Sequence, residues 1–167
     1  MLSRYWLIAL AGVVALIAVP LFLSTEEEQI LEQLERIRSL AEITSAENGI
    51  QQLSRTREIA RQFSAHTVFD LTSAGYGITE IPSRQELEQK ILSGRNRIIA
   101  LELSLDEPVV HIEGDTARVR VRGTALGSIR GEQGQFLDIH TIEVLLGKED
   151  GDWRVSGATH LRDERQP

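Results

Sequence analysis

The chain has 167 residues, of which 41% are hydrophobic and 26% charged, so it can form one domain with an ordinary core. Its formal net charge of −7 argues against a nucleic-acid partner, because binding to phosphates requires a surplus of Lys and Arg. The absence of cysteine excludes disulfides, thiolate metal sites and a cysteine nucleophile.

The N-terminus carries a long apolar run. Residues 5–23 contain no charged side chain and follow Arg4. As a helix this run would span roughly 28 Å, close to the hydrocarbon thickness of a bilayer. A cleaved signal peptide is the alternative, but its apolar region usually has only ~7–15 residues and ends in small residues. Here the run is longer and ends in Leu21, Phe22 and Leu23. We therefore expect residues 1–24 to form an uncleaved transmembrane anchor.

Charge around this run predicts the orientation. Arg4 precedes the run, whereas the ten residues after it include Glu but no Lys or Arg. The positive-inside rule then leaves the N-terminus in the cytoplasm. The sequence predicts a single-pass protein of the inner (cytoplasmic) membrane with its domain on the periplasmic, extracytoplasmic side.

The segment after the anchor has the signals of three helices. Ser24 and Thr25 with the following glutamates form a capping-box pattern, and apolar residues then recur at helical spacing as far as Ile43. Asn48-Gly49 ends this helix, and a second one is expected from residue 50 to about 64. A third begins after Ser83 and ends at residue 94.

The remaining chain is strand-like. Alternating apolar residues and turn signals predict strands at residues 66–71, 98–112, 117–126, 136–146 and 153–161. A bulge is expected at residues 106–108, because Pro108 cannot donate to the ladder. This order predicts an α+β domain, residues 25–163, with helices on one face of a curved antiparallel sheet, and a tail at 164–167.

Several short motifs resemble a known family. They are VFD at residues 68–70, EGDTARVRV at 113–121, and DGDWRV at 150–155 with His160 after it. With the order of elements, they resemble the nuclear transport factor 2-like superfamily, which includes SnoaL-like proteins and ketosteroid isomerases. The resemblance covers about residues 26–163 and implies a cone-shaped sheet with a pocket between sheet and helices. It does not imply one function, because members include isomerases, dehydratases, transport factors and membrane-bound assembly subunits.

The resemblance implies two acidic candidates, Asp70 in the first strand and Glu143 in a late one. A buried carboxylate in such a pocket could act as a base or as a neutral hydrogen-bond donor. The isomerases also use a tyrosine of the first helix, and the first two predicted helices here contain none. Because side chains alternate along a strand, Asp70 and Phe69 point to opposite faces. Burial of the larger apolar side chain, Phe69, is favoured. We therefore expect Asp70 to be exposed, unless His140 or Glu143 meets it inside a pocket.

The four histidines show no metal-ligand spacing. His140 and His160 could approach one another on adjacent strands, but two imidazoles do not make a metal site. No phosphate-binding loop or dinucleotide fingerprint occurs either. We expect no metal and no cofactor.

Arg118, Arg120 and Arg122 alternate with small apolar residues, which predicts a row of three arginines on one face of a strand. We call these residues the arginine row. The row could pair with carboxylates of neighbouring strands, with Glu113, Asp138 and Glu143 as the candidates. It could instead contact an acidic protein partner or a second copy of the chain.

These observations lead to two functional hypotheses. The first is a membrane-anchored, non-enzymatic interaction or assembly module of an envelope complex, whose layout resembles inner-membrane subunits of secretion systems. The alternative is a small-molecule-binding protein, or an isomerase- or hydratase-like enzyme, that uses the cone pocket with Asp70 as acid/base. For the core we expect Trp153, Val119, Val121, Phe63 and Leu145 to be buried.

Overall fold

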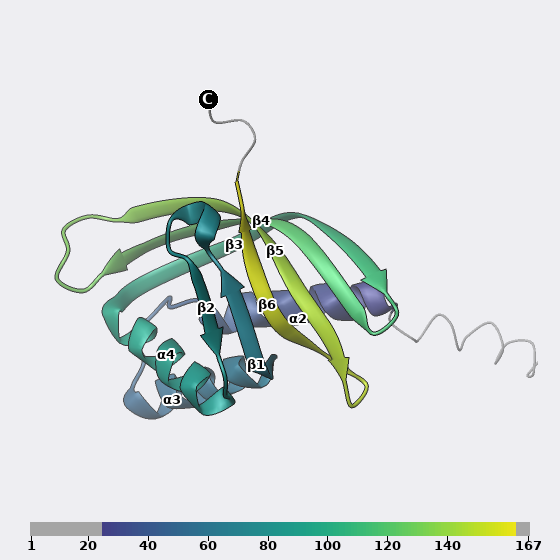
Figure 1. The fold of residues 1–167 in the computed structure, drawn as a ribbon. Helices are drawn as coiled ribbons and strands as arrows, with labels where there is room; N and C mark the ends of the chain where they lie inside the picture. Colours follow the sequence, from purple (N-terminus) through teal and green to yellow (C-terminus); the bar gives the residue numbers. More distant parts are fainter. Residues whose placement is uncertain (1–24, 163–167) are drawn as a thin grey trace, which may run out of the picture.

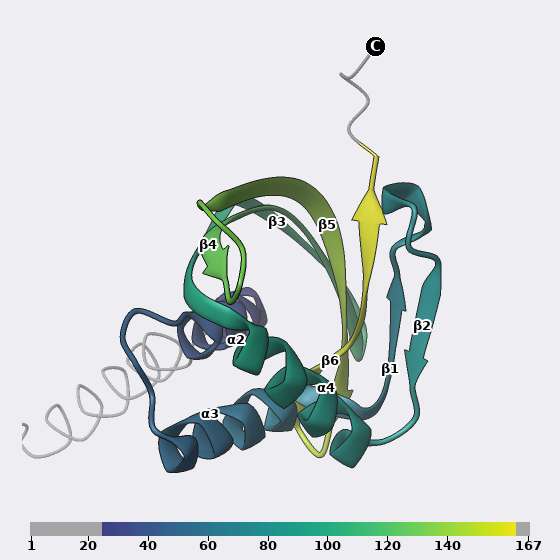
Figure 2. The ribbon, with the colours of Figure 1, turned by 90° about the vertical axis from the view of Figure 1, so that its left-hand side faces the viewer.

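The computed structural model describes residues 25–162, which form three α-helices and six strands. In chain order they are α2 (Glu26–Ala41), α3 (Gly49–Arg61), β1 (Phe63–Asp70), β2 (Ile78–Ile81), α4 (Arg84–Arg97), β3 (Ile98–Glu113), β4 (Thr116–Ile129), β5 (Phe136–Glu149) and β6 (Asp152–Leu161), as labelled in Figure 1. A short 3₁₀ helix, η1 (Thr72–Ala74), connects β1 to β2. The α+β prediction is confirmed, and the helices lie on the concave side of the sheet (Figure 2).

The sheet is mixed, and the prediction of a purely antiparallel sheet is wrong. The strand order is β2-β1-β6-β5-β4-β3, and β1 runs parallel to β6 while all other neighbours are antiparallel. The last strand, β6, lies between β1 and β5. The first and last strands of the chain are therefore neighbours in the sheet. Strand β2 was not expected from the sequence, because it has only four residues between a Gly-containing loop and Pro82.

The helix starts follow the predicted caps. Thr25 accepts a hydrogen bond from the Glu28 backbone and Glu28 bonds back to the cap, and Ser83 accepts one from the Glu86 backbone. The predicted helix ends need correction. Helix α2 stops at Ala41, because Ile43 forms an antiparallel bridge with Leu101 of β3.

Strand boundaries differ in a similar way. Helix α3 stops at Arg61, and Phe63 and Ser64, predicted as helical, already belong to β1. Strand β4 continues to Ile129 and not only to the predicted residue 126, so its connection to β5 shortens from residues 127–135 to 130–135. The bulge of β3 is confirmed, since its pairing with β4 shifts between Asp106 and Val109.

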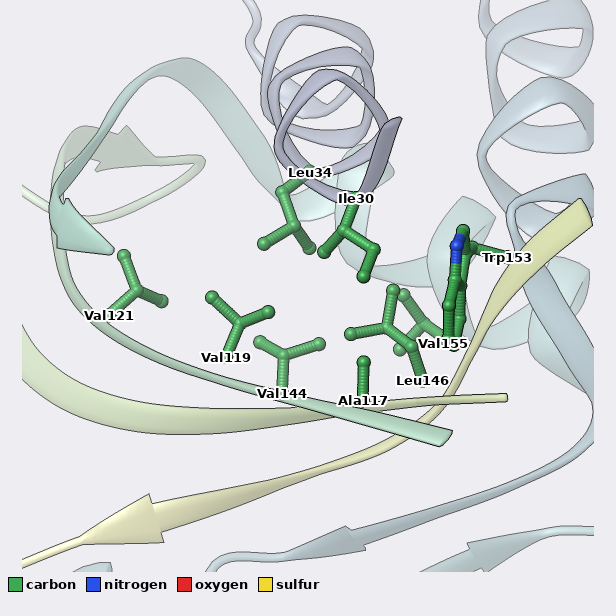
Figure 3. Close-up of a cluster of buried hydrophobic side chains, with 9 residues drawn as sticks. All are labelled: Ile30, Leu34, Ala117, Val119, Val121, Val144, Leu146, Trp153 and Val155. Carbon is green, nitrogen blue, oxygen red and sulfur yellow. The ribbon is translucent and has the colours of Figure 1, made fainter. Parts of the chain in front are cut away.

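The main core lies between α2 and the concave face of the sheet, where Ile30 and Leu34 point from α2 onto the strands (Figure 3). Its other members come from β4, β5 and β6: Ala117, Val119, Val121, Val144, Leu146, Trp153 and Val155. Trp153 is only 4% exposed, and Phe63 packs against the cluster while partly buried. Leu145 was expected in this core, but the buried residue is Leu146, because Val144 and Leu146 share the concave face and Leu145 lies on the other.

Within residues 25–162, no helix combines the length and apolar character needed to cross a bilayer. The predicted span, residues 5–23, lies outside the described part of the chain, as does the predicted tail at residues 164–167.

Candidate functional site

A cavity of about 370 Å³ lies between the second half of α2 and the concave face of the sheet. Its wall is apolar: Leu34, Ile37, Ala41, Phe69, Leu103, Leu105, Val121, Ile142, Val144 and Ala158 contribute to it. Cavities of about 300–1,000 Å³ lined mainly by apolar side chains, with a few polar groups, are typical of small-molecule sites. The cone is therefore lined by apolar side chains without being filled by them.

Gly123 leaves part of this space open. It lies in the middle of β4, on the concave face opposite Leu105 and His140. A Cβ atom there would approach nothing closer than the His140 carbonyl oxygen at 3.9 Å and a Leu105 methyl at 4.0 Å. At Gly157, by contrast, a Cβ atom would collide with the backbone of Val68. Sterics require glycine at Gly157 but not at Gly123, whose missing side chain enlarges the cavity.

The polar residues that line the cavity are Arg38 from α2, Ser104 and Thr124 from β3 and β4, and Asp138 and His140 from β5. Ser104 and Thr124 alternate with the concave-face residues of their strands, so Arg38, Asp138 and His140 are the polar side chains on the cavity side. His140 and Asp138 are two residues apart on one strand, so they point to the same face. Asp138 has no hydrogen bond or ion pair with any of residues 25–162. The apolar cavity therefore ends in a small polar rim.

His140 belongs to a chain of hydrogen bonds that leads away from the cavity. Its Nδ1 lies 3.0 Å from Nε2 of His160 on β6, and the two rings meet edge to face with centroids 4.9 Å apart. Nδ1 of His160 lies 2.6 Å from Oγ of Ser73 in η1. The Ser73 hydroxyl also donates to the backbone carbonyl of His160. We call Ser73, His160 and His140 the rim relay.

Arg38 is held in place by α2 and β3. Its Nε and Nη2 donate to Glu35, and its Nη1 donates to Glu42 Oε1 at 2.6 Å and to the Leu103 carbonyl at 3.0 Å. Hydrogen bonding to Glu35 raises the pKa of Arg38 and lowers the pKa of Glu35 in return. Glu42 also accepts from the Leu103 backbone N–H, so these side chains cover the open edge of β3 at this point.

The two acidic candidates lie outside the cavity. Asp70 pairs in register with Thr159, Thr159 with Glu143, and Glu143 with Arg120, so all four lie on one face. The neighbouring row through Phe69 lines the cavity on the opposite, concave face.

The carboxylate of Asp70 accepts a hydrogen bond from the Thr72 backbone at 3.0 Å. Hydrogen bonds from the Thr72 side chain and backbone lower the pKa of Asp70, opposite to the rise that a base in an apolar pocket would need. The structure thus does not bring Asp70 together with Glu143 or His140.

The arginine row is exposed on the convex face, as the alternation predicted. Across the register, Arg118 faces His111, Arg120 faces Glu143 and Arg122 faces Asp106. None of the three arginines makes an ion pair with any residue from 25 to 162. Of the expected pairing partners, Glu113 bonds to His111 and Asp138 lies on the other face.

Sequence reasoning did not identify Arg38 or Ser73, and it assigned Asp138 to the face of the arginine row. Asp138 shares the alternation of His140 and Ile142, so strand periodicity could have placed it on the concave face. Ser73 gave no signal, because only the turn of η1 brings it to His160, 87 residues away in sequence. No group of three or more His, Cys, Asp or Glu suited to a metal ion occurs among residues 25–162.

The profile of the SnoaL-like domain matches residues 32–159. The chain belongs to the SnoaL-like family. Among the curated proteins, none matches the chain.

Solved structures share the fold of this SnoaL-like domain at low sequence identity. The Kfla4162 protein of Kribbella flavida superposes with a TM-score of 0.67 at 13% identity, over 81% of this chain and 88% of its own. A nuclear transport factor 2-like protein with a cystatin-like fold from Novosphingobium aromaticivorans gives 0.61 at 16%, over 94% and 90%. A nuclear transport factor 2-like superfamily protein from Salmonella enterica gives 0.61 at 13%, over 83% and 91%. At such identities the likeness establishes the fold alone. The match of the SnoaL-like domain to residues 32–159 is what confirms the relationship expected from the sequence motifs.

Proposed function

We propose that this SnoaL-like domain binds a small, largely apolar molecule in its cone cavity while residues 5–23 hold it at a membrane. The cavity carries the proposal. Its volume of about 370 Å³ suits a ligand of one to three fused rings or an equivalent aliphatic chain, and its apolar wall would remove part of that ligand's surface from water. Transfer of apolar surface from water into this wall would supply most of the affinity, at about 25 cal/mol per Å².

Gly123 supports the same conclusion. A glycine inside a strand weakens the strand, because it costs backbone entropy and packs no side chain. Neither a positive φ angle nor a close backbone contact requires glycine at this position. An open cavity for a ligand gives the glycine a role that packing alone does not.

The alternative hypothesis combined ligand binding with catalysis by Asp70. The geometry supports the binding but not the chemical step. Asp70 and Glu143 lie on the convex face, and Asp138 and His140 line only the rim. A catalytic role for Asp70 would need its carboxylate beside the ligand, on the face that Phe69 occupies.

The binding test is a comparison of two glycine-to-leucine variants of the full chain in the same detergent. In Gly123→Leu the new side chain occupies the cavity, so binding of naphthalene should weaken by tenfold or more, about 1.4 kcal/mol. Gly147→Leu is the matched control, because Gly147 also lies in a strand and a Cβ atom there meets nothing within 4 Å. Equal naphthalene binding by both variants would reject the cavity as the site.

The membrane part of the proposal rests on the uncharged run at residues 5–23 with Arg4 before it. We place the chain in the inner (cytoplasmic) membrane with the domain on the extracytoplasmic side. The full chain should then stay with membranes through a carbonate wash, and a C-terminal reporter should be active outside the cytoplasm. Mature protein that begins after Ser24 and is found in the soluble fraction would contradict the anchor.

The arginine row favours a second candidate function, assembly with a protein partner. Three exposed guanidinium groups without an ion pair among residues 25–162 form a positive strip on a chain of net charge −7. Exposed Val109 lies in register with Arg120, which adds apolar surface beside the strip. An acidic partner fits this strip better than a second copy would, because two arginine rows placed face to face repel. In this candidate the chain is an anchored subunit of an envelope complex.

A further inference from the structure

The rim relay fixes which hydrogen-bonding group a ligand of the cavity must carry. We infer that the ligand donates a hydrogen bond, from a hydroxyl or N–H group, to Nε2 of His140. This inference rests on the proposed function and narrows the ligand to a small apolar alcohol, phenol or amine-like donor.

The direction of the relay begins at Ser73. Its hydroxyl carries one hydrogen, and the backbone carbonyl of His160 can only accept, so Ser73 donates to that carbonyl. Oγ of Ser73 must then accept from Nδ1 of His160, its second partner at 2.6 Å. His160 is therefore protonated on Nδ1.

The relay continues through the pair of rings. In its neutral form, His160 with a proton on Nδ1 has a lone pair on Nε2, which can only accept. Nε2 of His160 lies 3.0 Å from Nδ1 of His140, so Nδ1 of His140 must donate. That leaves the lone pair of His140 on its Nε2, which has no partner among residues 25–162.

The other polar groups of the rim reinforce this preference. Asp138 is a carboxylate and can only accept when ionised. Arg38 has committed four hydrogen bonds to Glu35, Glu42 and the Leu103 carbonyl, which leaves one of its five N–H groups. The rim is thus rich in acceptors and poor in donors. A ligand carbonyl or carboxylate placed there would face lone pairs, whereas a hydroxyl would be satisfied.

Ser73 and His160 are positioning residues in this account, because they act through His140. Nitrogen-15 NMR of the full chain at mildly alkaline pH reads their effect directly, since protonated and unprotonated ring nitrogens resonate far apart. Both His140 and His160 should carry their proton on Nδ1. A proton found on Nε2 of neutral His140 would overturn the inference. In Ser73→Ala, the fraction of His160 that carries its proton on Nδ1 should fall.

Ligand preference is tested with two probes of one ring system, 2-naphthol and 2-methoxynaphthalene, each bound to the full chain in detergent. The Gly123→Leu variant in the same detergent corrects for uptake by micelles. A hydrogen bond of ordinary strength predicts that 2-naphthol binds about 2- to 10-fold more tightly. The preference, measured as the ratio of the two dissociation constants, should disappear in His140→Phe.

The outcomes separate this inference from the proposed function. Equal binding of both probes by the natural chain, or a preference that survives in His140→Phe, would overturn the inference and leave the cavity as a binding site. Binding of neither probe would reject the proposed function itself. A phenol preference that vanishes in His140→Phe and falls in Ser73→Ala would support both.

Discussion

Arg95 of α4 connects the C-terminus of α2 to Glu47, in the segment between α2 and α3. It lies near the end of α4, is only 6% exposed, and donates to the carbonyls of Leu40 and Ala41 at 3.1 and 3.0 Å. Its second terminal nitrogen donates to both oxygens of Glu47, at 2.9 and 2.8 Å. These bonds hold the C-terminus of α2, where Ala41 lines the cavity, against α4.

Replacing this arginine should be costly. Arg95→Met leaves the carboxylate of Glu47 largely buried, with Arg55 at 3.3 Å as its remaining cation. Breaking a buried ion pair by removing one partner costs about 3–5 kcal/mol, and the remaining Arg55 contact argues for about 3 kcal/mol. With an m-value of about 2 kcal/mol per molar urea, the unfolding midpoint should fall by about 1.5 M.

A matched pair on the same helix provides the control. Lys90 and Glu86 are half-exposed and lie 3.6 Å apart at i,i+4, so Lys90→Met should cost no more than about 0.5 kcal/mol. Adding Glu47→Leu to Arg95→Met should restore part of the loss, because no unpaired charge then remains buried. If Arg95→Met costs less than about 1 kcal/mol in urea unfolding, the reasoning about a buried pair is refuted.

Three further predictions test the sheet. Leu146→Ala should cost about 2–5 kcal/mol in urea unfolding and Leu145→Ala less than half as much, and the reverse order would contradict the assigned faces of β5. Asp70 has a lowered pKa, so its carboxylate stabilises the fold above its unfolded pKa, and this contribution is lost as pH falls through the folded pKa. The melting temperatures of Asp70→Asn and the natural chain should therefore converge on acidification, and a constant difference would be inconsistent with the Thr72 hydrogen bonds. Replacing the arginine row with serine should abolish co-purification of partner proteins with little change in melting temperature, whereas a fall in melting temperature with full partner recovery would refute the interface.

Much of the fold could be predicted because local signals and the tertiary structure agree. The caps at Thr25 and Ser83 set the helix starts, and the alternation through Val119 and Val121 set the buried face of β4. The element boundaries failed where tertiary pairing overrode local preference. Ile43 fits a helix by spacing, but its backbone pairs with Leu101.

The site was harder to predict than the fold. The family resemblance suggested Asp70 and Glu143 as site residues. The register of their strands, however, places both side chains on the convex face. The features of the cavity depend on what is absent or distant: a missing side chain at Gly123, and a contact between Ser73 and His160 that no local pattern encodes. The membrane anchor lies outside the described residues and stays a prediction.

The most direct test of the central claim is the position of a bound probe in the full chain. Methyl-labelled protein should give intermolecular nuclear Overhauser effects between naphthalene and the methyl groups of Val121, Ile142 and Val144, which line the cavity. The exposed methyl groups of Val109 and Ile99 provide the comparison on the surface. Contacts to the cavity methyls that disappear in Gly123→Leu are the predicted result. Contacts only to Val109 and Ile99, or contacts to the cavity methyls that persist in Gly123→Leu, would contradict it.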